Sequence, residues 1–162
     1  MRLFVIEYHT VFVLLHILSA MLWIGSMAMF VVAVYPSLKQ IPNEKIMIRT
    51  SIRTLRRYFF WILWIGLING ISGILMAIAA GYSYQSPITA AMVNTKEAIW
   101  LFMGLLSLYA FRKTVLAKAR CLASDTPQAR DNIRLITNYL FVVMIFLGMA
   151  ALYFGVMLGE NG

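Results

Sequence analysis

The chain has 162 residues, of which 62% are apolar and 12% are charged, and its mean hydropathy is +0.81. This composition excludes an ordinary soluble domain and indicates a membrane protein in contact with the lipid bilayer. The net charge of +8 does not indicate a nucleic-acid partner, because the bases cluster in two short segments beside long apolar runs.

Four apolar runs are each long enough to cross a hydrocarbon core of ~30 Å as a helix. The predicted helices cover residues of about 4–35, 58–80, 96–113 and 134–158. Their short connections predict an all-α membrane protein: a four-transmembrane-helix, up-and-down bundle in a single domain, 1–162. The only cysteine, Cys121, excludes a disulfide within the chain.

The first predicted helix, which we expect to end before Pro36, carries a polar and aromatic seam in an otherwise apolar run. Its members recur every seven positions and therefore lie along one face of a helix. These residues are His9, His16, Trp23 and Phe30. An ionisable group within a membrane span is costly to bury, so His16 is a candidate functional residue that needs a partner on another helix.

Twelve of the fourteen bases lie in the two segments that connect helices one to two and three to four. These bases are Lys39, Lys45, Arg49, Arg53, Arg56, Arg57, Arg112, Lys113, Lys118, Arg120, Arg130 and Arg134. The segment 81–95 between them has no charge. The positive-inside rule therefore places both basic segments in the cytoplasm and both termini outside. The pattern over 46–57 predicts an amphipathic turn or helical extension on anionic headgroups.

The second predicted helix begins with an aromatic cluster, 58–64, that is typical of a membrane interface. It continues with small residues on one face, Gly66, Gly70 and Gly73, which favour close helix packing or form a groove for a flat cofactor or a lipid. Asn69 and Ser72 are expected to form hydrogen bonds between helices.

The third predicted helix has Asn94 or Thr95 as its expected N-cap. Lys96 follows and, in the simplest interpretation, extends to the outer interface beside Glu97. The face that contains Lys96 also contains Trp100, so it is partly polar.

His9 and His16 are the candidate metal ligands, but seven helical residues separate them by about 10.5 Å. That distance is too large for both rings to bind one ion. A haem b could use His16 as axial ligand and Lys96 for a propionate, and a bis-histidine haem would require a homodimer or a larger membrane complex. Copper is the alternative, with soft methionine ligands. The candidates are Met21, Met27, Met76, Met92 and Met103. No motif for hydrolysis or nucleotide use is present, so no catalytic residue is assigned.

Residues 15–25, LHILSAMLWIG, contain a histidine followed seven positions later by Trp-x-Gly. This stretch resembles the first-helix signature of the superfamily of copper resistance protein D (CopD) and HemJ-type proteins. Residues 56–58 before a glycine-rich helix, and Lys96, add to the resemblance. It implies a small, multi-pass protein of the bacterial inner membrane with haem or copper chemistry. In HemJ-type protoporphyrinogen oxidases, the residues that match His16 and Lys96 are functional.

The chain departs from the HemJ-type pattern at 36–37, 109–110 and 138–140, which places it closer to the CopD side. The leading hypothesis is an outer-half pocket for haem or copper, built by His16, Trp23 and Lys96, that serves cofactor handling or electron transfer. One alternative is a HemJ-like protoporphyrinogen IX oxidase. Another is a non-catalytic accessory or assembly subunit whose polar seam binds a partner helix.

Overall fold

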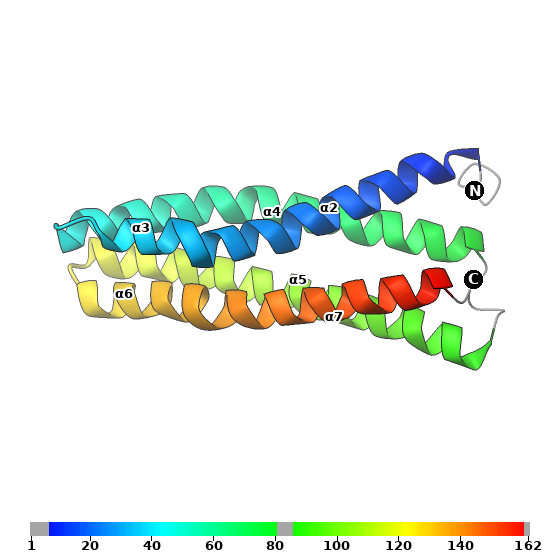
Figure 1. Ribbon diagram of the computed structural model, residues 1–162. Coiled ribbons are helices and arrows are strands. Elements are labelled where there is room, and N and C mark those ends of the chain that lie inside the picture. Colours follow the sequence, from blue (N-terminus) through cyan, green and yellow to red (C-terminus); the bar gives the residue numbers. More distant parts are fainter. Residues whose placement is uncertain (1–6, 81–85, 161–162) are drawn as a thin grey trace.

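The computed structural model describes residues 7–80 and 86–160, which are helical nearly throughout and include no strand. Four helical stretches are long and apolar enough to cross a membrane: His9–Lys39, Glu44–Ala79, Pro87–Leu122 and Thr126–Leu158. They run antiparallel, and α2 begins at the end of the bundle where α7 ends (Figure 1). The predicted all-α class with four spans is therefore confirmed.

The spans are built from eight helical elements. These are α2 (His9–Met29), η1 (Phe30–Val34), α3 (Tyr35–Lys39), α4 (Glu44–Ala80), α5 (Pro87–Leu122), α6 (Thr126–Leu135), η3 (Ile136–Leu140) and α7 (Phe141–Glu160). Helix α2 packs against α4 and α7, and α5 packs against the same two helices. Helices α2 and α5 therefore face each other diagonally across the bundle.

Three of the helical spans are longer than the sequence predicts. The second begins at Glu44 rather than near position 58, the third covers Pro87–Leu122 rather than 96–113, and the fourth begins at Thr126 rather than near position 134. The reason is that the basic segments are themselves helical and continue the membrane spans, and residues 87–95 of the uncharged segment do the same at the start of α5. The predicted extension over 46–57 is thus the first part of α4.

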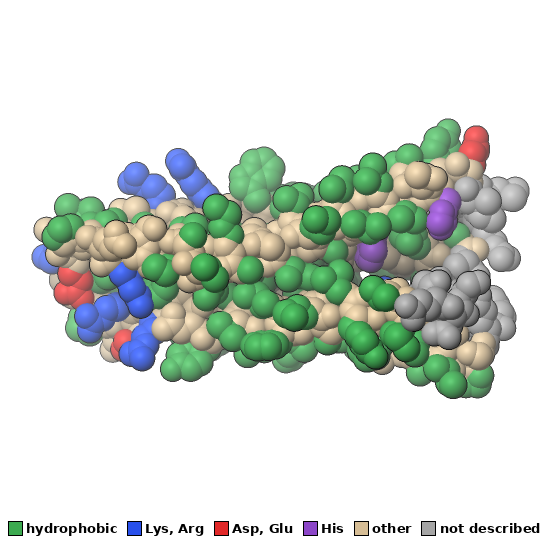
Figure 2. Space-filling model, in the orientation of Figure 1, with side chains coloured by type: hydrophobic (Ala, Val, Ile, Leu, Met, Phe, Trp, Pro, Cys, Tyr) green, Lys and Arg blue, Asp and Glu red, His purple; other side chains and the backbone are tan. Residues whose placement is uncertain are grey.

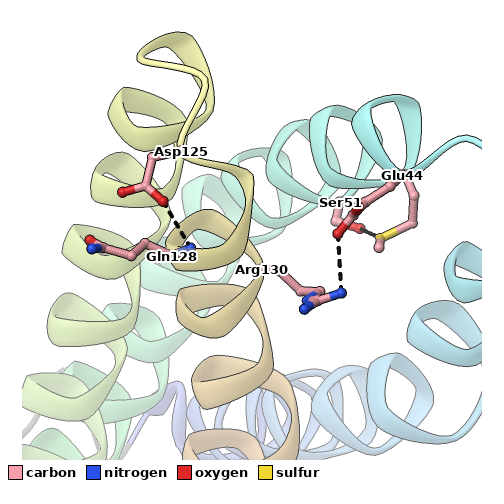
Figure 3. A network of polar contacts seen from close by, with 6 residues as sticks. Glu44, Ser51, Asp125, Gln128 and Arg130 are labelled. Carbon is pink, nitrogen blue, oxygen red and sulfur yellow. Dashed lines mark hydrogen bonds and ion pairs between the residues drawn. The ribbon is translucent and has the colours of Figure 1, made fainter.

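Polar side chains cap the starts of these three helices. Asn43 Oδ1 accepts a hydrogen bond from the Ile46 N–H (3.2 Å), and Ser86 Oγ accepts one from the Thr89 N–H (3.2 Å). Asp125 caps α6 in the same way, with its carboxylate 3.3 Å from the Gln128 nitrogen (Figure 3). The expectation that Asn94 or Thr95 caps the third helix is wrong, because proline follows Ser86 and starts the helix there.

The first span does not end before Pro36, as the sequence suggests, but continues to Lys39. A π-helical turn, η1, precedes the proline, and the Tyr35 N–H donates to the carbonyl of Phe30, five residues earlier. A π turn contains one more residue than the α-helical turn it replaces. This wider turn accommodates a proline that would otherwise clash with the preceding turn.

The extra residue also shifts the buried face of the first span. Trp23 and Phe30 are 4% and 3% exposed, so this part of the seam faces the bundle interior as predicted. The seven-residue spacing would next bury Ser37, but Ser37 is exposed and Tyr35 is buried instead. A second π turn, η3, lies in the fourth span and contacts η1.

Basic side chains gather at the end of the bundle where α3 and α6 lie (Figure 2). An ion pair between Arg130 and Glu44, 3.1 Å apart, joins α6 to α4 there (Figure 3). Apolar side chains cover much of the outer surface between the two ends (Figure 2), which is compatible with lipid contact.

Candidate functional site

His16 of α2 binds to the backbone of α4. Its Nδ1 lies 2.9 Å from the carbonyl oxygen of Asn69 and 3.3 Å from Ser72 Oγ. Because a carbonyl oxygen only accepts, the geometry assigns the proton of the neutral imidazole to Nδ1. The ring therefore donates towards α4, and its orientation is fixed by that contact.

The Asn69 side chain completes the connection between the two helices. Its Nδ2 donates to the carbonyl oxygen of His16 (3.0 Å) and to Ser19 Oγ (3.2 Å). The Ser72 hydroxyl lies 2.8 Å from the carbonyl oxygen of Ile68. Asn69 and Ser72 thus form hydrogen bonds between helices, as predicted. Two hydrogen bonds of opposite direction therefore join His16 and Asn69: the imidazole donates to the Asn69 carbonyl, and the Asn69 amide donates to the His16 carbonyl.

The other ring nitrogen of His16, Nε2, makes no hydrogen bond within residues 7–80 and 86–160. With the proton on Nδ1, Nε2 carries a lone pair. Histidines that bind metals commonly have this arrangement, in which one nitrogen donates to a carbonyl and the other is the ligand. His16 is half-buried, so the ring is neither fully sealed in the core nor fully exposed to lipid.

The glycine face of α4 is filled by aromatic rings. A β-carbon on Gly66 would stand 3.0 Å from the Trp23 ring, and one on Gly73 would stand 2.9 Å from Cε1 of His16. A β-carbon on Gly70 would overlap the ring of Trp100. These contacts support close packing, and a flat cofactor on this face would have to displace the three rings.

Lys96 of α5 points into the bundle. Its Nζ lies 3.3 Å from the position of a β-carbon on Gly155 of α7. Among the described residues, neither a hydrogen bond nor an ion pair joins Lys96 to a partner, and none joins it to Glu97. Lys96 therefore packs against Gly155 of α7 and forms no ion pair with Glu97, and its extension to the outer interface stays a prediction.

Trp23 lies two helical turns deeper than His16. Its indole N–H is buried and has no hydrogen-bond partner in the described part of the chain. Together with Trp100 and Gly66 it lines a groove of about 220 Å³. Trp100 differs from Trp23, because its Nε1 donates to the carbonyl oxygen of Gly66 (2.8 Å).

His9 is exposed at the start of α2 and does not join His16 in one site. Within the described residues, no group of three or more His, Cys, Asp or Glu side chains could hold a metal ion. A ligand set built on His16 would therefore add methionine sulfurs of this chain, or groups from a cofactor or a second chain, to the imidazole.

Two parts of the site have weak signals in the sequence. The Asn69 carbonyl is backbone, so its role leaves no side-chain pattern, although Gly73, four residues later, provides the space for the ring that reaches it. Gly155 is one of several glycines on α7, and only the structure shows that Lys96 packs on it.

No family model, curated protein or solved structure matches this chain. The chemistry of the site therefore rests on its own groups. These are an imidazole nitrogen with a free lone pair, an ammonium without a counter-ion among the described residues, and a buried indole N–H without an acceptor.

Proposed function

We propose that this chain is a haem-binding protein of the bacterial inner membrane, related to the CopD and HemJ-type superfamily, that serves electron transfer or cofactor handling. Bases gather at one end of the bundle (Figure 2), and the positive-inside rule supports a cytoplasmic position for that end. With this orientation, the pocket of His16, Trp23 and Lys96 would belong to the outer half of the bilayer. The observation that carries the proposal is the His16 ring, whose Nδ1 donates to the Asn69 carbonyl while Nε2 remains available as a ligand.

Lys96 favours haem over a bare copper ion. The positive ammonium of Lys96, which points into the bundle, would attract the carboxylate of a haem propionate and would repel a bare metal cation. Lys96 has no anionic partner among the described residues, so a propionate would supply the missing counter-charge. Copper with methionine ligands stays the alternative, and the metal content of the purified protein distinguishes the two.

The chain's own groups have separate tasks in this proposal. His16 would hold the cofactor through the lone pair of Nε2, and the Asn69 carbonyl fixes the ring and increases its basicity. Trp23 offers an N–H to an acceptor at the buried side of the site. Bound haem would supply one-electron exchange.

A visible absorption spectrum of the purified protein tests the proposal. The wild-type chain should show the Soret band of haem, and His16→Ala should abolish it. His9→Ala is the matched control and should keep the band, because His9 is exposed and separate from the site. Lys96→Met should weaken haem binding by about tenfold, the equivalent of one charge-assisted contact.

Other outcomes would assign other functions. A colourless protein that binds copper, together with loss of that copper in His16→Ala, would favour the copper alternative. Growth rescue of a strain without protoporphyrinogen oxidase would identify the HemJ-like enzyme, with the same two residues required. A protein with neither haem nor metal would contradict the proposal and favour the accessory-subunit alternative.

A further inference from the structure

A groove of about 940 Å³ runs between α4 and α5 from the basic end of the bundle, and neither His16, Trp23 nor Lys96 lines it. Five basic side chains line it: Arg49, Arg53, Arg56 and Arg57 of α4, and Lys118 of α5. No carboxylate is among the lining residues. The two ion pairs among the described side chains use Arg120 and Arg130, which lie outside the groove. The groove therefore concentrates positive charge that has no counter-charge among the described residues.

The lining changes in character along α4. Arg53, Arg57, Phe60, Trp64 and Leu67 follow one another at spacings of three and four residues, so they share one helix face. The order is basic, then aromatic, then aliphatic. The rings of Phe60 and Trp64 are 57% and 56% exposed, so these apolar groups are open to the surroundings rather than packed in the core.

The length of this face matches one leaflet of a bilayer. From Arg57 to Leu67 the helix rises about 15 Å, at ~1.5 Å per residue. Half of a hydrocarbon core of ~30 Å is also about 15 Å. A molecule with a negative headgroup at Arg53 and Arg57 would therefore place its apolar chain beside Trp64 and Leu67.

We propose that this groove is a binding site for an anionic phospholipid of the leaflet at the basic end. The phosphate binds the arginines, and an acyl chain lies along the aromatic and aliphatic part of the groove. A free phosphate would leave this apolar part uncovered, and an acidic protein segment would match the arginines but not the exposed rings. Basic pockets between spans are the usual sites of such lipids. The proposal is independent of haem binding.

The single cysteine of the chain, Cys121, lines the same groove and provides a direct measurement. The full chain is purified in a neutral detergent and freed of lipid, and the rate at which a maleimide labels Cys121 is followed. Phosphatidylglycerol should slow the labelling in a saturable manner. Phosphatidylcholine and inorganic phosphate should not slow it at equal concentrations.

Arg53→Gln/Arg57→Gln should lower the phosphatidylglycerol affinity by at least about tenfold, because each base near an anionic lipid contributes several-fold. Arg112→Gln/Arg134→Gln is the matched control: it removes two exposed bases that do not line the groove and should change the affinity less than about threefold. Trp64→Ala leaves all bases in place and should also weaken binding. The helical circular dichroism spectrum of each variant verifies that it folds.

Three results would overturn the proposal. An equal loss of phosphatidylglycerol affinity in Arg53→Gln/Arg57→Gln and in Arg112→Gln/Arg134→Gln would mean that the lipid is attracted by net charge and not bound at a specific site. Protection by inorganic phosphate alone would mean a simple anion site. Protection of Cys121 by a polyglutamate peptide, unaffected by Trp64→Ala, would assign the groove to an acidic protein segment.

Discussion

The β-carbon that Gly73 lacks would stand 2.9 Å from Cε1 of His16. This distance is shorter than a normal carbon contact, so the absence of a side chain on α4 allows the imidazole of α2 to reach the Asn69 carbonyl. The glycine and the histidine form one structural unit, although 57 positions separate them in the numbering of the chain.

We expect Gly73→Ala to displace the His16 ring and weaken its hydrogen bond to Asn69. Haem binding should fall strongly, and the protein should lose about 1–3 kcal/mol of stability, as overpacked sites do. Absorption titration with haem and thermal unfolding in detergent measure the two effects. Gly25→Ala is the control, because nothing lies within 4 Å of its missing β-carbon. Equal behaviour of the two variants would contradict the close contact.

Gly70→Ala should be more damaging than Gly73→Ala. Its β-carbon would overlap the Trp100 ring, which is held in place by the hydrogen bond from Nε1 to the Gly66 carbonyl. We expect a loss of about 2–3 kcal/mol, the upper part of the range for overpacking. Adding Trp100→Leu should recover part of that loss, since the smaller side chain leaves space for the methyl group. Strictly additive effects in thermal unfolding would disprove the contact.

Trp23 and Trp100 should respond differently to removal of the indole N–H. Benzothienylalanine keeps the shape of the side chain but lacks the donor, so it isolates the hydrogen bond. At Trp100 we expect a loss of about 1 kcal/mol, because the bond to Gly66 is removed. At Trp23 the donor has no partner in the described part of the chain, so stability of the cofactor-free protein should be unchanged or increase. A similar loss at both positions would reveal an acceptor for Trp23.

The ion pair between Arg130 and Glu44 should contribute little. Both side chains are half exposed, and exposed pairs typically contribute about 0.2–1 kcal/mol. In a double-mutant cycle with Arg130→Gln and Glu44→Gln, the coupling energy should be below about 1 kcal/mol and should decrease at high salt. A coupling above about 2 kcal/mol would mean that α6 depends on this pair for its position.

Hydropathy and charge were enough to predict the number of spans and the burial of Trp23 and Phe30. The seam of α2 predicts its own inward face because buried groups must recur with the helical period. The ends of the helices could not be predicted from hydropathy, because hydropathy identifies the residues in the membrane core and the helices continue beyond it. Ser86 and Pro87 did provide a signal, since a serine before a proline is typical of a helix start.

Only part of the candidate site could be predicted from the sequence. His16 and Lys96 stand out because ionisable groups are rare in membrane spans. The Asn69 side chain was predictable as an interhelical hydrogen-bond partner. The role of its backbone carbonyl as the acceptor for His16 was not, because every residue has a backbone carbonyl. The seven-residue spacing failed after Phe30, since a π turn changes the helical phase and neighbouring sequence does not reveal it. Tyr35 is buried for that reason rather than Ser37.

The π turns η1 and η3 each contain one residue more than an α-helical turn. A one-residue deletion should therefore have a different effect in a π turn than in the α-helices of the bundle. A single-residue deletion inside an α-helix rotates everything beyond it by about 100° and misaligns the packed faces. Deleting Tyr139 from η3 would instead convert the turn to regular α-helix and keep both faces in phase. In η1, the same shortening would return Pro36 to a regular turn and restore its clash, so it would be tolerated only together with Pro36→Ala.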